Sequence, residues 1–155
     1  MRAEEYRVLA EFRYQIRRFL HASERAARAC GLEPQQHQLL LAICGLPDGQ
    51  RATVGTLARR LLLAHHSVVE LIDRLEARGL VRRQRNAEDR RVVTVGVTAR
   101  GRRLLRRLSL QHRRLLEQAG PELVHALEQV LARNGRGRQP MRHTAPASLA
   151  GRRRG

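Results

Sequence analysis

The chain has 155 residues, of which 42% are hydrophobic, and its formal net charge is +17 at pH 7. This length fits one domain, or one domain with a tail, and the apolar content is sufficient for a core. The chain contains no apolar run of about 18 residues and its first residues are polar, which argues against a transmembrane helix and a signal peptide. We therefore expect a cytoplasmic protein with no membrane partner.

The positive charge is concentrated in one part of the chain. Residues 51–107 hold 15 arginines against 5 acidic residues, whereas residues 1–50 and 108–133 are close to neutral. The final segment, 134–155, holds 6 arginines and no acidic residue, and its glycine-rich composition predicts a disordered basic tail. A basic excess within one folded segment predicts that this segment faces a polyanion.

The first 50 residues have the pattern of two helices. Residues 3–29 lack glycine and proline, and their apolar residues recur every three or four positions, which predicts one helix that ends at Gly31. Pro34 begins a second helix, whose apolar middle indicates a buried position. The segment 45–49 is a loop by composition.

Residues 53–97 have the pattern of a helix–turn–helix followed by a β-hairpin. Thr53 can cap a short helix, and after a break at 62–63 a second helix runs to Gly79. Strands are expected at 80–85 and 91–97, joined by a charged turn. This order of elements predicts a winged helix.

The rest of the ordered chain is expected to be helical. Thr98 can cap a long helix, which Gly120 and Pro121 must break or kink, and residues 123–131 form a final amphipathic helix. The expected fold class is mainly α with a small β-hairpin, a winged helix-turn-helix flanked by N-terminal and C-terminal helices.

The second helix of the helix–turn–helix supplies the candidate base contacts. A helix in the major groove reads base edges with side chains near its N-terminal end, where histidine, serine and glutamate can exchange hydrogen bonds with bases. Arginines near this helix are suited to contact DNA phosphates, and the arginines at the hairpin tip are suited to enter the minor groove. Asp89 can pair with an arginine of the tip and hold it in one orientation. We favour phosphate contact over a solvated face for the strand arginines Arg82, Arg83 and Arg85. The candidate DNA-binding residues are His65, His66, Ser67, Val69, Glu70, Arg59, Arg60, Arg74, Arg85, Asp89, Arg90 and Arg91.

Three segments together resemble the MarR family of bacterial transcription regulators: residues 53–62, 67–81 and 88–101, the last with its Asp-Arg-Arg sequence. The resemblance in helix order extends over about residues 5–133. It implies a homodimer with dimerisation helices in 1–33 and 99–133 and a DNA-binding lobe in 34–98. It also implies a pseudo-palindromic double-stranded operator and a repressor released by a small aromatic or phenolic effector, bound between the dimerisation region and the DNA-binding lobe.

Several side chains admit more than one interpretation. Tyr14, Arg18 and His21 are the candidate ligand contacts if such a pocket exists, although the aromatic residues of the first helix are favoured as dimer core. Cys30 and Cys44 are expected to be inert and buried, with a thiol switch as the alternative.

Metal binding is weighed at two places. His21, Cys30, His37 and His112 could meet in a zinc site but lack tight ligand spacing, and the adjacent His65 and His66 point about 100° apart on a helix. We therefore expect no metal and no cofactor.

The competing function is non-specific nucleic-acid binding by an architectural or RNA-binding protein. The absence of aromatic residues from 51–107 argues against a reader of single-stranded RNA, which needs stacking platforms. No nucleophile–base pair, phosphate loop or metal signature is present, so we do not expect an enzyme. The sequence leaves the effector, the operator and the direction of regulation open.

Overall fold

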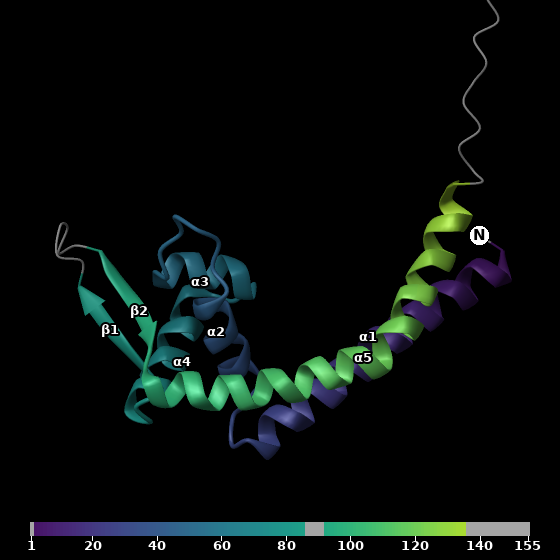
Figure 1. Cartoon of the computed structure of the whole chain (residues 1–155). Helices are drawn as coiled ribbons and strands as arrows, with labels where there is room; N and C mark the ends of the chain where they lie inside the picture. Colours follow the sequence, from purple (N-terminus) through teal and green to yellow (C-terminus); the bar gives the residue numbers. More distant parts are fainter. Residues whose placement is uncertain (1, 86–91, 136–155) are drawn as a thin grey trace, which may run out of the picture.

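The computed structural model describes residues 2–85 and 92–135 of the chain. The elements in chain order are α1 (Ala3–Ala29), α2 (Pro34–Cys44), α3 (Val54–Leu61), α4 (His65–Ala77), β1 (Val81–Arg85), β2 (Val93–Val97) and α5 (Ala99–Gly135). Helices α1 and α5 run side by side as a long arm, and α2, α3, α4 and the hairpin form a lobe at one end of it (Figure 1). The expected fold class, mainly α with a β-hairpin, is confirmed.

Local chemistry sets the ends of these elements, largely where the sequence predicts. The backbone N–H of Thr56 donates to Thr53 Oγ1 at 3.2 Å, which caps α3. In the same way the N–H of Gly101 donates to Thr98 Oγ1 at 3.1 Å at the start of α5. Gly79, just past α4, has a φ of +66°, a conformation that glycine adopts without steric cost.

The core of the lobe lies where α2, α3 and α4 meet the hairpin and the first half of α5. The strands are antiparallel, with Val81 opposite Val97 and Arg85 opposite Val93. The β2 strand is also tied to the segment before α3, because the N–H of Val95 donates to the carbonyl of Ala52 at 2.9 Å. Fully buried side chains of this core are Leu32, Leu39, Leu40, Leu57, Val68, Ile72, Leu75, Val81 and Leu108.

Gly101 permits a close approach of α5 to the hairpin. A Cβ atom at this position would lie 2.2 Å from the carbonyl oxygen of Leu80 and 2.7 Å from Val97 Cγ1. Both neighbours belong to the buried part of the lobe, so neither can move cheaply. The glycine is therefore required by packing at the point where the arm joins the lobe.

The sequence predicts a break or a kink at Gly120 and Pro121, and the structure has no break there. Helix α5 is continuous from Ala99 to Gly135 with Pro121 inside it, and its course bends towards its yellow-green end (Figure 1). Proline removes one N–H donor from the helix, and the second half of α5 continues in contact with α1. Arg18 of α1 pairs with Glu122 at 2.8 Å, and Ala126 is buried.

Candidate nucleic-acid interface and interlobe cavity

One face of α4 is available for a partner. Its buried residues Val68, Leu71, Ile72 and Leu75 face the core of the lobe. On the other side, His65, His66 and Glu70 are exposed near the N-terminal end, and Ser67 and Val69 are partly buried. The structure thus brings the predicted base-contact residues to one end of one helix, which is the arrangement that a groove-reading helix requires.

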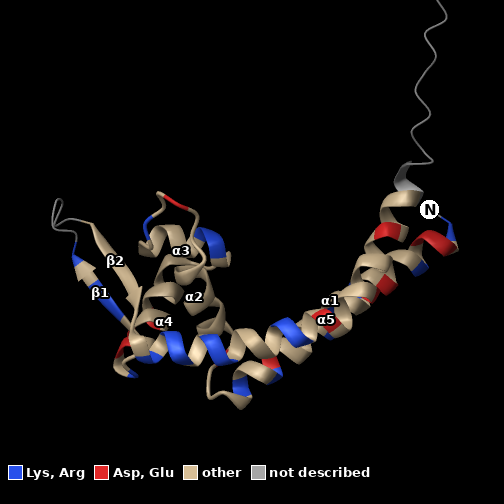
Figure 2. Ribbon diagram, viewed as in Figure 1, with Lys and Arg blue, Asp and Glu red and all other residues tan. Residues whose placement is uncertain are grey.

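Arginines flank this face. Arg59 and Arg60 are exposed near the end of α3, and Arg85 is exposed at the end of β1. Arg74 lies 3.4 Å from Glu70 in an exposed pair, one turn apart on α4. Figure 2 shows arginine on α3, on β1 and along the first half of α5, whereas arginine and acidic residues are mixed along α1 and the far half of α5. The positive charge is therefore gathered on the lobe and its junction with the arm.

Arg83 differs from the expected phosphate contact. Its guanidinium group bridges Asp73 and Glu76 of α4, and its backbone N–H donates to Glu76 Oε1 at 2.7 Å. The hydrogen bond to Asp73 is the main reason that the pKa of Arg83 lies above its ordinary value. Arg83 thus fixes the hairpin on α4, a positioning role that the sequence interpretation missed. The only signal of this role in the sequence is Glu76, which lies near the end of a predicted helix and seven residues before Arg83.

The hairpin tip lies outside the described residues. Asp89, Arg90 and Arg91 belong to residues 86–91, so their predicted minor-groove role stays a prediction. The same holds for the basic tail beyond residue 135. The structure describes the base of the hairpin. Arg83 holds it against α4, and Val95 binds it to the segment before α3.

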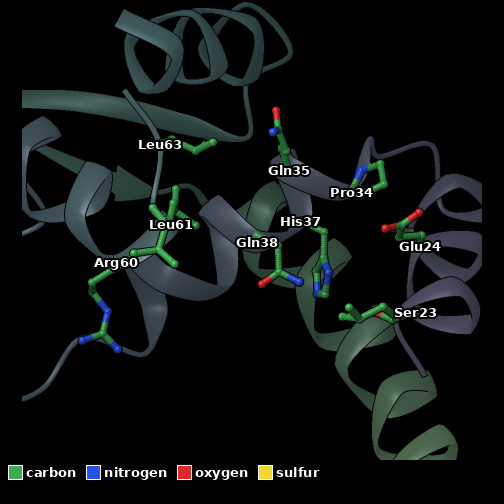
Figure 3. A pocket seen from close by; sticks show the side chains of 12 residues that line it. Ser23, Glu24, Pro34, Gln35, His37, Gln38, Arg60, Leu61 and Leu63 are labelled. Atoms are coloured by element: carbon green, nitrogen blue, oxygen red, sulfur yellow. The ribbon is translucent and has the colours of Figure 1, made fainter. Parts of the chain in front are cut away.

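A cavity of about 550 Å³ lies between α1, α2 and the turn that joins α3 to α4. Figure 3 shows Ser23 and Glu24 on one side, His37 and Gln38 from α2, and Arg60, Leu61 and Leu63 on the other side. Cavities of several hundred Å³ with mostly apolar walls and a few polar groups are typical of small-molecule sites. The cavity lies between α1 of the arm and the end of α3 in the lobe.

The ligand contacts suggested by the sequence do not line this cavity. Helix α1 contributes Leu20, Ser23, Glu24 and Ala27, a stripe with helical spacing. His21 is exposed on another face of the helix, Tyr14 lies more than two turns before Ser23, and Arg18 is paired with Glu122. Tyr14, Arg18 and His21 therefore do not contact this cavity, and their role as ligand contacts stays a prediction.

His37, which lines the cavity, stacks on His112 of α5. The rings of His37 and His112 have centroids 4.5 Å apart and planes 10° apart. The Nδ1 atom of His112 lies 3.0 Å from the carbonyl of Leu108, so that nitrogen is assigned the proton, and Nε2 accepts from the Ser23 hydroxyl at 2.6 Å. Burial, and then the proximity of His112, lowers the pKa of His37 from 6.5 to about 4. His37 is therefore neutral at pH 7.

The residues weighed as a zinc site are only partly brought together. His37 and His112 meet, but the described residues contain no group of three or more potential metal ligands. Cys30 is partly buried, with its Sγ 3.6 Å from Gln111 Oε1. Cys44 is exposed, so the expectation of a buried thiol is wrong there, because the end of α2 turns it away from the core. Partial desolvation raises the pKa of the Cys44 thiol, which disfavours the reactive thiolate.

The comparisons with known proteins agree on one family. A model described as the MarR family matches residues 31–92. The transcriptional repressor CouR, bound to a 23-mer DNA duplex, is 30% identical over 79% of this chain and 87% of its own, with a TM-score of 0.59. CouR from Rhodococcus jostii RHA1, bound to p-coumaroyl-CoA, is 28% identical over 64% of this chain and 68% of its own, with a TM-score of 0.57.

Other neighbours extend the likeness in fold to more of the chain. Sco3205, a MarR family transcriptional regulator from Streptomyces coelicolor in complex with DNA, covers 94% of this chain and 95% of its own, at 24% identity and a TM-score of 0.66. Comparison with curated protein sequences gives no significant match. Among the described helices, none combines the length and the apolar character that crossing a membrane requires.

Proposed function

The chain belongs to the MarR family of transcription regulators, and we propose that it acts as a homodimeric repressor that binds a pseudo-palindromic operator and is released by a small ligand. DNA binding and regulation follow from the family. The observation that carries the proposal is the exposed N-terminal end of α4, with His65, His66 and Glu70 beside the arginines of α3. This end would enter the major groove, and Arg59 and Arg60 would contact phosphates.

The arm supports the proposed homodimer. Helices α1 and α5 expose large apolar side chains between 40% and 60%, among them Tyr6, Tyr14, Leu110, Val124 and Leu131. Large apolar side chains exposed together on two neighbouring helices are costly in water and are typical of an interface. A second copy of the chain, related by a two-fold axis, would cover it. We assign dimerisation to residues 1–33 and 99–133 and DNA binding to residues 34–98, with 134–155 as a basic tail that adds non-specific attraction to phosphate.

The cavity supports the proposed release by a ligand. CouR binds p-coumaroyl-CoA, and this chain has a cavity of about 550 Å³ between the arm and the lobe. A small aromatic or phenolic effector in this position would touch the arm and the α3–α4 turn together. An effector that binds one arrangement of the arm and the lobe more tightly than another would favour that arrangement. The distance between the two α4 helices of the dimer would then change.

Selection from a library of random DNA duplexes tests the proposal. The expected result is a motif with two-fold symmetry and half-sites about 10 base pairs apart, or a multiple of that distance, as for dimers that place one helix in each major groove. Sedimentation should give the mass of a dimer. Retention of duplexes without a common motif would instead support the competing function, non-specific binding by a basic protein.

A further inference from the structure

A second concave surface lies where the end of α1, the end of α4 and the first turns of α5 meet. This hollow has a volume of about 340 Å³ and shares no lining residue with the interlobe cavity. Its wall holds no acidic residue of the part of the chain that the structure describes. It is lined by four arginines, Arg78, Arg100, Arg103 and Arg107, and by two leucines, Leu80 and Leu104.

Three of these arginines lie on one face of α5 and have no partner of opposite charge. Arg100, Arg103 and Arg107 follow the spacing i, i+3, i+7, which places them on the same side of the helix. All three are exposed, and none has a hydrogen bond or an ion pair within residues 2–85 and 92–135. Further along α5, by contrast, Arg113 pairs with Glu117 at 3.1 Å. The three unpaired charges repel one another, and a bound anion would relieve that repulsion.

Arg78 is held in place from the other side of the hollow. It directly follows α4, and its guanidinium group donates to the carbonyl of Gly31 at 2.8 Å and to Gln36 Oε1 at 3.1 Å. Gln36 is itself buried, so this anchor is part of the core of the lobe. A guanidinium group has five N–H donors, and two such bonds leave others for a ligand. Because Arg78 is already ordered, less conformational freedom is lost when a ligand binds.

We propose that this hollow binds a small oligophosphate, an anion with two or more linked phosphate groups. Guanidinium groups bind phosphate oxygens through paired, charge-assisted hydrogen bonds. Several of them around one hollow favour a multivalent anion over a single carboxylate, because the attraction grows with the charge of the ligand. Leu80 and Leu104 add an apolar part to the wall, so both inorganic pyrophosphate and the diphosphate of a nucleotide fit this chemistry.

The position of the hollow favours a small molecule over the DNA backbone. Helix α4 has 13 residues and is therefore about 20 Å long, which separates Arg78 from the end at His65 that is proposed to enter the major groove. The volume of about 340 Å³ lies within the range of small-molecule sites and does not admit a duplex. A bound oligophosphate would leave the groove-reading end of α4 free.

Calorimetric titration of the full-length chain without DNA tests the proposal, with pyrophosphate, ADP and orthophosphate at constant ionic strength. Pyrophosphate and ADP should each saturate one site per chain, and orthophosphate should bind about tenfold more weakly because it carries less charge. Tighter binding of ADP than of pyrophosphate would support a nucleotide, and equal binding would support recognition of the diphosphate alone.

Arg103→Gln should lower the affinity for pyrophosphate about tenfold. Arg106→Gln is the matched control, because Arg106 is also exposed on α5 but does not line the hollow. Its effect should stay below about twofold. Equal effects of the two substitutions would overturn the proposal, because they would indicate diffuse attraction to a basic surface.

Cys30 gives a second measurement, because it also lines the hollow. In Cys44→Ser, which removes the other cysteine, pyrophosphate should slow the reaction of Cys30 with the uncharged reagent dithiodipyridine several-fold. The proposal is overturned if pyrophosphate does not bind saturably or does not protect Cys30. It is also overturned if Arg103→Gln, but not Arg106→Gln, weakens the binding of a scrambled DNA duplex about tenfold, since the hollow would then belong to the DNA-binding surface. The calorimetry and the thiol reaction contain no DNA, so failure of operator recognition would leave their results unaffected.

Discussion

Acid should destabilise the protein through His37, and the size of the effect follows from its pKa. In the unfolded chain histidine has a pKa of 6.5, and in the folded chain that of His37 is about 4, because the side chain is buried against His112. The unfolded state therefore takes up the proton first as the pH falls. The stability contributed by neutral His37 is complete above pH 6.5, declines between pH 6.5 and 4, and then stays constant. Between pH 7.5 and pH 5 the loss is about 2 kcal/mol per chain.

Urea unfolding at a fixed protein concentration measures this loss. The native chain, His37→Gln and His21→Gln are compared at pH 7.5 and pH 5, with His21 as the exposed control on α1. The quantity to compare is the change in unfolding free energy between the two pH values, because the loss of the stacked ring alters absolute stability as well. His37→Gln should lose about 2 kcal/mol less than the native chain on acidification, and His21→Gln should follow the native chain.

If His37→Gln and the native chain lose the same free energy between pH 7.5 and pH 5, His37 is not held neutral by its surroundings. Repulsion among the arginines and titration of the carboxylates act on both chains equally, so the difference between the two chains isolates the histidine.

Other predictions concern the junction and the hairpin. Gly101→Ala should cost about 1–3 kcal/mol in urea unfolding, because its Cβ would lie 2.2 Å from a backbone oxygen, whereas Gly120→Ala, with open space around it, should be neutral or stabilising. Arg83→Gln should cost about 1 kcal/mol or less, as partly exposed pairs do, but should lower affinity for the selected operator several-fold by releasing the hairpin from α4. Arg91→Ala should weaken operator binding without a change in helix content or dimer mass, and unchanged affinity would contradict the wing assignment.

Much of the fold could be predicted from the sequence because its signals are local. Thr53 and Thr98 cap the helices that they precede, and Pro34 begins α2, since each acts through groups within one turn. The sequence does not decide between a break and a kink at Pro121, because the contribution that keeps the helix continuous is not local. Packing between α1 and α5, including the pair of Arg18 and Glu122, outweighs one lost hydrogen bond.

The candidate site was predicted only in part, for a similar reason. The exposed end of α4 follows from helical periodicity, which separates His66 from the buried stripe. The stack of His37 on His112 joins residues 75 positions apart, and no spacing rule indicates it.

Fluorescence anisotropy measures whether α4 and the hairpin read a specific DNA sequence. Native protein is titrated at physiological salt against the symmetric duplex obtained by selection and against a scrambled duplex of equal composition. A preference of about 10³-fold or more is the predicted result, within the range of specific regulators. Equal affinity for the two duplexes would exclude sequence-specific recognition and would assign the positive charge to non-specific binding.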